Sequence, residues 1–282
     1  MEELTLKDKI KTYLINKKKE VVLIITGIVI LLCTVIISIM KLSSGEVIAA
    51  AKSRNAYLEG KTITKLAYDT SKEIEKGPSK SYGKVVYLTI DDGPSQYTDE
   101  IIKILNKNNV KATFFMINSN MKAYPEQVKH IVESGNTAGF HSVSHDIHKL
   151  YKTDNSAKKE FDINQETFKK ITGKTSKVVR LPFGSKPYTS RGSYNAIINA
   201  GYKLWDWTLD TEDWKSTSSQ IIENVKKHAK DTDNIVLLMH ERKQTIPVID
   251  EMIKYFKKEG FQILPIEESQ EGRNYWNGKL FN

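Results

Sequence analysis

The sequence predicts an α/β domain, a (β/α) barrel of about seven parallel strands, preceded by an N-terminal transmembrane helix and a linker. Three observations support this prediction. Residues 21–40 carry no charge, short apolar segments alternate with longer amphipathic ones from residue 84 onward, and chemically versatile polar residues follow the short segments. Alternation of this kind is typical of repeated β-α units around a mostly parallel sheet.

The first element is a membrane helix at residues 21–40. Its twenty uncharged residues match the ~20 that cross ~30 Å of hydrocarbon, whereas a cleaved signal peptide has a shorter apolar core. Residues 47–51 (VIAAA) resemble a cleavage site, so cleavage stays open as the alternative. Lysines at 17–19 precede the helix and only Lys41 follows closely. The positive-inside rule therefore places residues 1–20 in the cytoplasm and the rest outside the cell membrane.

Charge and cysteine content exclude several functions for the outer part. The net charge is +9, and residues 1–40 hold six lysines and four acids, which leaves +7 for the remainder. These lysines are scattered, so we expect wall polymers or lipid head groups as neighbours rather than nucleic acid. The one cysteine, Cys33, lies in the membrane helix, which excludes disulfides and a catalytic cysteine outside. We expect a monomer.

A polar linker leads to the domain. Residues 41–83 contain clusters of Gly, Pro and Ser and are expected to form a stalk, residues 84–267 form the domain, and residues 268–282 are a tail without an assigned structure. The predicted strands are residues 85–90, 112–117, 137–140, 178–181, 202–207, 235–239 and 261–265. The predicted helices are residues 99–108, 125–134, 156–172, 190–200, 218–230 and 244–258. Gly135, Gly201 and Gly260 near helix ends predict left-handed caps.

Five polar residues each follow a predicted strand: Asp91, His141, Arg180, Asp210 and His240. A closed barrel brings such residues to one rim, whereas an open sheet spreads them over many strand widths. Periodicity alone leaves a doubly wound sheet as an alternative, and the position of these residues favours the barrel.

The histidines and the acidic pair indicate a metal site. His141 and His145 are four residues apart, so a helical turn would place both imidazoles on one side, and Asp92 offers a third ligand. Two nitrogens and one carboxylate leave positions open for water and substrate. Neighbouring side chains on a strand point oppositely unless the backbone turns, which the following Gly-Pro permits. Asp91 is then free to act as a base. The structural alternatives are a surface histidine pair and a polar strand cap.

Five motifs occur in order along the chain: T-I-D-D-G-P at 89–94, H-S-V-S-H at 141–145, R-L-P-F-G at 180–184, D-T-E-D-W at 210–214 and L-M-H at 238–240. They resemble the motifs of the polysaccharide deacetylases, carbohydrate esterase family 4, also called the NodB homology domain. Ile replaces the usual Phe in the first motif and Phe replaces Tyr in the third. The first departure keeps a large apolar side chain, and the second removes only a hydroxyl.

The resemblance implies a distorted (β/α) barrel that hydrolyses a linear amide, the N-acetyl group of an amino sugar. It implies a metal held by Asp92, His141 and His145, with Zn²⁺ as the expected ion and Co²⁺, Ni²⁺ or Mn²⁺ as alternatives. By the same resemblance, Asp91 is the general base and His240 the general acid.

The resemblance also assigns supporting residues. Asp213 holds the His240 ring, Arg180 orients Asp91, and the backbone N–H of Phe183 stabilises the oxyanion. Trp214 and Leu238 form the pocket for the acetyl methyl, although core packing explains both equally. The sugar specificity is expected to depend on groove residues at 118–121, 185–193 and 241–244.

The expected substrate is peptidoglycan N-acetylglucosamine, because a tethered enzyme on a stalk acts on a polymer fixed near the membrane. The alternatives are an N-acetylmuramic acid deacetylase, a chito-oligosaccharide deacetylase, an acetyl-xylan esterase, and a non-catalytic wall-binding protein.

Overall fold

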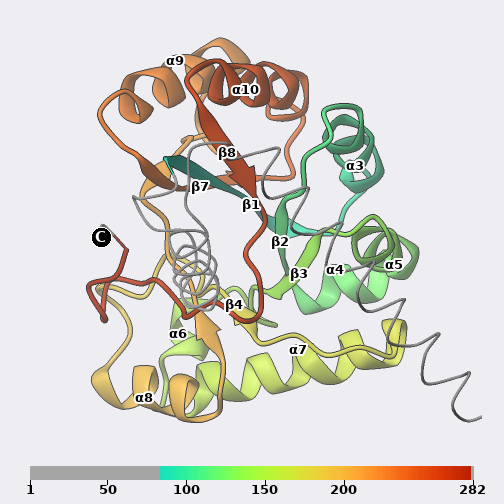
Figure 1. Ribbon diagram of the computed structural model, residues 1–282. Helices are drawn as coiled ribbons and strands as arrows, with labels where there is room; N and C mark the ends of the chain where they lie inside the picture. The colour runs from blue at the N-terminus through green and yellow to red at the C-terminus, as the bar shows by residue number, and fades with distance from the viewer. Residues whose placement is uncertain (1–82, 281–282) are drawn as a thin grey trace, which may run out of the picture. The chain divides into compact units, whose positions relative to one another are not determined.

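A computed structural model describes residues 83–280, in which helices surround a set of strands (Figure 1). The strands are β1 (Lys84–Gly93), β2 (Thr113–Met116), β3 (Thr137–Phe140), β4 (Val178–Val179), β5 (Lys203–Leu204), β6 (Leu209–Asp210), β7 (Asn234–His240) and β8 (Phe261–Leu264). The helices are α3 (Thr98–Lys107), α4 (Asn118–Ala123), α5 (Pro125–Glu133), α6 (Ile147–Leu150), α7 (Ser156–Thr172), α8 (Arg191–Asn199), α9 (Ser218–Ala229) and α10 (Ile246–Lys258).

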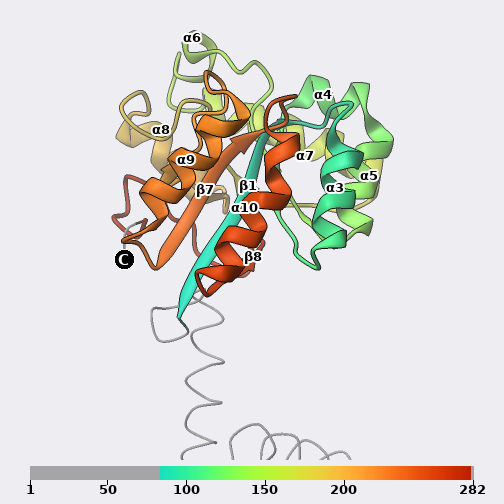
Figure 2. The same cartoon turned by 90° about the horizontal axis from the view of Figure 1, so that it is seen from above.

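The strands form one parallel sheet that curls into an incomplete barrel. Their order is β5-β4-β3-β2-β1-β7-β6, and β8 pairs with the first half of β1. The helices follow this order on the outside: α9 packs on α10, then α3, α5, α7 and α8 follow (Figure 1), while the turned view shows β1 and β7 running lengthwise through the domain (Figure 2). The edge strands β5 and β6 do not pair with each other within residues 83–280. The predicted α/β fold with about seven parallel strands is therefore confirmed, as a barrel that stays open at one place.

Strand β1 divides its side chains between two apolar cores. Val86 and Leu88 join the core between the sheet and the helices, whereas Val85 and Tyr87 join the core inside the barrel. Because successive side chains of a strand point to opposite faces, Asp91 belongs to the inner face. The register of β1 thus places this carboxylate inside the barrel, at the C-terminal end of the strand.

The predicted strand at 202–207 is corrected by the structure. Within this range only residues 203–204 (β5) pair with a neighbouring strand, and strand pairing resumes at residue 209, where β6 begins. In the interval the carbonyls of Trp205 and Asp206 accept hydrogen bonds from Arg180 (3.2 and 3.1 Å), and the Asp206 N–H donates to the Arg273 carbonyl (2.8 Å). The backbone leaves the ladder because these partners, remote in sequence, replace a neighbouring strand.

The sequence did not predict two short helices, but it did predict the left-handed glycines at three helix ends. α4 has six residues and α6 has four, too few for the apolar periodicity that reveals a helix. Gly135, Gly201 and Gly260 have φ of +75°, +83° and +82°, which confirms the left-handed helix ends.

The predicted N-terminal segments lie outside the described residues. They are the cytoplasmic segment 1–20, the membrane helix 21–40 and all but the last residue of the stalk 41–83. Among residues 83–280, none of the helices has the length and apolar character needed to span a bilayer.

The segment after residue 267, which had no assigned structure, packs along the open edge of the barrel. The Asn274 amide donates to the Leu204 carbonyl (3.1 Å), and the Tyr275 hydroxyl donates to the Trp207 carbonyl (3.0 Å). The Arg273 guanidinium lies over the Tyr87 and Trp205 rings, 5.5 and 5.7 Å from their centroids. The C-terminal segment therefore covers the place where β5 and β6 do not meet.

This packing requires glycine at position 272. A Cβ added to Gly272 would lie 2.4 Å from the Leu204 carbonyl oxygen and 2.7 Å from its nitrogen, both backbone atoms that cannot rotate away. Gly272→Ala should therefore lower the free energy of unfolding by about 1–3 kcal/mol, the usual cost of overpacking. Urea denaturation measures this, with Glu268→Ala, at an exposed position nearby, as the control. Equal stability of Gly272→Ala and the natural chain would show that the segment is not held against β5.

Candidate active site

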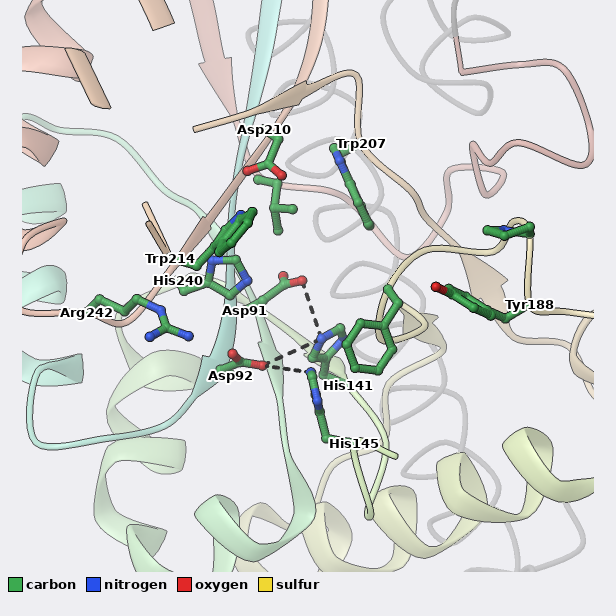
Figure 3. Close-up of a pocket in the computed structure, with 13 residues that line it drawn as sticks. Asp91, Asp92, His141, His145, Tyr188, Trp207, Asp210, Trp214, His240 and Arg242 are labelled. Carbon is green, nitrogen blue, oxygen red and sulfur yellow. Dashed lines mark ion pairs between the residues drawn. The ribbon is translucent and has the colours of Figure 1, made fainter. Parts of the chain in front are cut away.

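The acidic pair lies where the alternation of β1 breaks. Asp92 has a left-handed backbone (φ 68°), and the register between β1 and β2 shifts between Asp91 and Gly93. The turn is thus at Asp92 itself, one residue before the Gly93-Pro94 pair at which the sequence predicted it. The Asn120 amide donates to the Asp92 carbonyl (2.7 Å) and holds this conformation. Both carboxylates consequently face one cleft, although they are neighbours on a strand (Figure 3).

The two histidines come from a loop, and the predicted helical turn is wrong. Residues 141–145 adopt no helix, and Ser142 and His145 have φ of 73° and 47°. The Glu160 carboxylate of α7 accepts two backbone N–H groups of the loop (2.8 and 2.9 Å) and the Ser144 hydroxyl (2.7 Å). Left-handed residues of this kind cost free energy and occur mainly at functional sites. The loop, held by α7, brings His141 and His145 together as predicted, by a different backbone path.

Asp92, His141 and His145 form a cluster suited to a metal ion. One ligand atom from each lies within 4.8 Å of the others. Asp92 Oδ1 is 3.6 Å from His141 Nε2 and 3.3 Å from His145 Nε2, and this buried oxygen has no hydrogen-bond partner among the described residues. A buried carboxylate oxygen without a partner is costly unless a cation satisfies it. The donor set of two nitrogens and one oxygen fits a catalytic divalent cation.

Protonation states agree with this fit. Burial lowers the pKa of His141, and His141 Nδ1 lies 3.0 Å from the Arg180 carbonyl, so a proton on Nδ1 leaves the Nε2 lone pair directed at Asp92. Burial raises the pKa of Asp92, but the contact with His145 and the charge of the nearby histidines outweigh it and hold that pKa well below its usual range. Burial lowers the pKa of His145, and Asp92 raises it to a greater extent. A cation therefore competes with a proton for His145.

Asp91 stands beside this cluster and pairs with a buried arginine. Its Oδ1 accepts from Arg180 Nη1 (2.9 Å), while Oδ2 lies 3.6 Å from His141 Nε2. Arg180 is fully buried, and it also donates to the Thr89 hydroxyl (2.6 Å) and to the carbonyls of Trp205 and Asp206. A buried guanidinium held by four hydrogen bonds is rigid, so it fixes the Asp91 carboxylate in one orientation.

His240 lies at the end of β7 with its ring held by Asp213. Asp213 Oδ1 is 2.7 Å from His240 Nδ1, and Oδ2 accepts from the His240 N–H (2.7 Å) and the Thr245 hydroxyl (2.6 Å). Burial lowers the pKa of His240, but Asp213, followed by Asp91 and Asp92, outweighs burial and raises the pKa to about 9. The imidazole is therefore a cation at neutral pH, and its Nε2 proton is available on the cleft side.

One cleft of about 560 Å³ is lined by Asp91, Asp92, His141, His145 and His240, while Arg180 and Asp213 support it from behind. Phe183, Trp214 and Leu238 lie there as predicted, together with Tyr188 and Trp207. Figure 3 shows Trp214 and His240 on one side of the cleft and Tyr188 on the other. Phe183 has a left-handed backbone (φ 65°), and its N–H donates to no acceptor among residues 83–280. The cleft therefore combines an acidic base, a cationic acid, a candidate metal cluster, a free backbone donor and apolar walls.

Three residues that support the cleft were not predicted as site residues. The buried Asp206 carboxylate accepts from the Ser185 N–H (2.8 Å), the Ser185 hydroxyl and the Tyr275 N–H (2.8 Å), and thereby fixes the loop that carries Phe183. Glu160 fixes the histidine loop as described above. Arg242 lines the cleft without an ion pair or side-chain hydrogen bond in the described part of the chain. Only Arg242 had a sequence signal, because it falls in the groove segment 241–244.

Comparisons with known proteins agree with the geometry. The family model for polysaccharide deacetylases matches residues 79–205. The chain is 34% identical over 242 residues to a peptidoglycan-N-acetylglucosamine deacetylase of Bacillus cereus, covering 81% of this chain and 86% of the relative. It is 32% identical over 191 residues to the peptidoglycan-N-acetylmuramic acid deacetylase PdaC of Bacillus subtilis, covering 67% of this chain and 39% of that one. The crystal structure of the polysaccharide deacetylase Bc1974 from Bacillus cereus matches with a TM-score of 0.66 at 35% identity, covering 70% of this chain and 98% of that one.

Proposed function

Because the chain belongs to the polysaccharide deacetylase family, we propose that it removes N-acetyl groups from a cell-wall glycan, with peptidoglycan N-acetylglucosamine as the substrate. One observation carries the proposal. The buried Oδ1 of Asp92 faces the Nε2 atoms of His141 and His145, with Asp91 on the adjacent side and cationic His240 across the cleft. Amide hydrolysis needs this combination, because water must lose a proton while the leaving nitrogen gains one.

The residues that would hold the metal are Asp92, His141 and His145. A zinc-like cation bound there supplies Lewis acidity toward water and the acetyl carbonyl. Zinc suits two imidazoles and a carboxylate, and cobalt, nickel and manganese accept the same set. The rest of the chemistry belongs to side chains that surround the cluster.

Four residues move protons or stabilise charge. Asp91, oriented by its ion pair with Arg180, takes the proton of the attacking water on its carboxylate. The free N–H of Phe183 donates to the oxyanion that develops on the acetyl oxygen. His240 then gives its Nε2 proton to the departing sugar nitrogen, while Asp213 stabilises the imidazolium before that transfer. Leu238 and Trp214 surround the acetyl methyl and keep water from its apolar face.

The membrane helix predicted at residues 21–40 supports a substrate fixed near the cell surface. We therefore place the domain outside the cell membrane, on a single-pass anchor and a stalk. Deacetylation there would convert neutral acetamides of the wall into amines that are protonated at neutral pH, which makes the polymer more cationic.

Mass analysis of muropeptides tests the reaction and the sugar together. Full-length protein in detergent, loaded with zinc, should release acetate from purified peptidoglycan and leave glucosamine in place of N-acetylglucosamine. Loss of acetyl from muramic acid, from chito-oligosaccharide alone or from xylan would instead identify one of the related activities. Binding to wall without acetate release would identify a non-catalytic wall-binding protein.

Asp213→Asn should shift the alkaline limb of the kcat–pH profile toward lower pH. A histidine is protonated below its pKa, so acid catalysis by His240 is present below about pH 9 and declines as the pH rises through that value. Asn retains an oxygen for the His240 Nδ1 proton but removes the negative charge that raises the pKa. Acetate release measured from pH 6 to 10 checks this, with Asp231→Asn, an exposed residue, as the matched control. An unchanged alkaline limb in Asp213→Asn would remove His240 from the role of acid.

A further inference from the structure

The cleft contains one cationic side chain that the proposed chemistry does not use. Arg242 is exposed and lines the cleft, where Figure 3 shows it on the side of His240 and Trp214, away from Tyr188. Its guanidinium has no carboxylate within ion-pair distance and no hydrogen-bond acceptor among residues 83–280. Arg180, in contrast, donates its hydrogen bonds to Asp91 and to buried oxygens. The Arg242 donors are therefore available to a ligand in the cleft.

The backbone that carries Arg242 is held firmly. Its N–H donates to the His240 carbonyl (2.9 Å), and its carbonyl accepts from the Thr245 N–H (2.9 Å) as the chain enters α10. The preceding Glu241 carboxylate accepts the hydroxyls of Ser95 (2.6 Å) and Thr98 (2.7 Å), which ties this turn to the loop after β1. The guanidinium thus extends into the cleft from a fixed backbone position next to the proposed acid.

A guanidinium at this place favours an anionic ligand. Its planar fork donates two parallel hydrogen bonds to a carboxylate, and such charge-assisted pairs are roughly twice as strong as neutral ones. A neutral N-acetylated glycan offers only hydroxyls and amides. Peptidoglycan offers carboxylates on the sugar next to N-acetylglucosamine, either on the lactyl ether itself or on the peptide attached to it. Charge complementarity of this kind sets specificity more than total affinity.

We propose that Arg242 binds a carboxylate carried by the saccharide next to the one that loses its acetyl group, and so selects acidic wall glycan over neutral glycan. This inference rests on the proposed function and extends it to the choice of substrate. Arg242 acts on binding and makes no contact with the reacting amide, so its contribution is expected in KM.

The experiment compares each substrate with its own neutral ester. Zinc-loaded full-length protein in detergent is tested on two series of peptidoglycan oligosaccharides. The first series has no peptide and carries lactyl carboxylates, and the second carries the peptide. Each series is supplied as the free acid and as the methyl ester, which gives four substrates. The natural chain should prefer the acid by about tenfold in kcat/KM in at least one series, which identifies the source of the carboxylate. Arg242→Ala should abolish the preference, Arg242→Lys should keep part of it, and the matched control Lys243→Ala, exposed and outside the cleft, should retain it.

The outcomes separate the two proposals. An acid preference that survives in Arg242→Ala, or a natural chain without preference in both series, overturns the role of Arg242 while deacetylation stands. Equal losses on acid and ester in Arg242→Ala also overturn it, because they indicate a structural effect. No acetate from any of the four substrates refutes the proposed function, and this inference with it.

Discussion

Asp91→Asn should bind one equivalent of zinc like the natural chain and release acetate about 10²–10⁴-fold more slowly. Asp91 is outside the group of three ligand atoms that converge, so the cation site should survive. The base, however, would lose the charge that accepts a proton. Asn is the right replacement because its oxygen can still accept from the buried Arg180 Nη1, whereas removal of the whole side chain would also leave that N–H without an acceptor.

Zinc content and kcat measured on the same preparation check this result. Asp231→Asn, on the surface, is the matched control and should keep both values. A thermal melt shows whether the substitution has changed the fold rather than the chemistry. Natural turnover in Asp91→Asn would show that Asp91 is not the base, and loss of zinc would show that it is a ligand.

His141→Ala should lose zinc and activity together. Loss of a partner behind a metal ligand already costs 10–100-fold in affinity, and loss of the ligand itself should exceed about 100-fold. His141 is buried, with 3% of its surface exposed, so the alanine variant also leaves a cavity. His141→Gln, which fills most of that space without an imidazole, separates the two effects because it should lose zinc with a smaller loss of stability.

Histidines elsewhere serve as controls for this result. His148, on α6 three residues after His145, is exposed and outside the metal cluster, so His148→Ala should keep zinc and turnover. Zinc is measured by elemental analysis after dialysis, and activity by acetate release. Equal zinc content in His141→Ala and the natural chain would contradict the assignment of the ligands.

The parts of the fold that depend on local pattern were predictable. The strand and helix positions followed from apolar periodicity, and the order of motifs placed the polar residues at strand ends. The structure of the segment 202–207 was not predictable, because its backbone forms hydrogen bonds with Arg180 and Arg273. These partners are too far away in the sequence for a local pattern to reveal them. The cover over the open edge by residues after 267 was not predictable for the same reason. It depends on contacts between chain segments about seventy residues apart, such as Asn274 with Leu204.

In the site, too, some features were predictable from the sequence and others were not. The residue types and their order indicated which side chains carry chemistry, yet the backbone that aligns them was predicted incorrectly at the histidines. Left-handed Asp92, Ser142, His145 and Phe183 are conformations that propensity disfavours for residues other than glycine, so only tertiary contacts maintain them. Glu160 and Asp206 supply such contacts from outside every motif. Functional sites are where local rules and the final structure are expected to disagree.

A zinc titration followed by acetate release tests the central claim most directly. Full-length protein is stripped with a chelator, and zinc is returned in steps below one equivalent with peptidoglycan as the substrate. We expect no acetate from the stripped protein, a linear rise with added zinc and a plateau at one ion per chain. Full activity of the stripped protein, or no activity once zinc is bound, would contradict a hydrolase built on Asp92, His141 and His145.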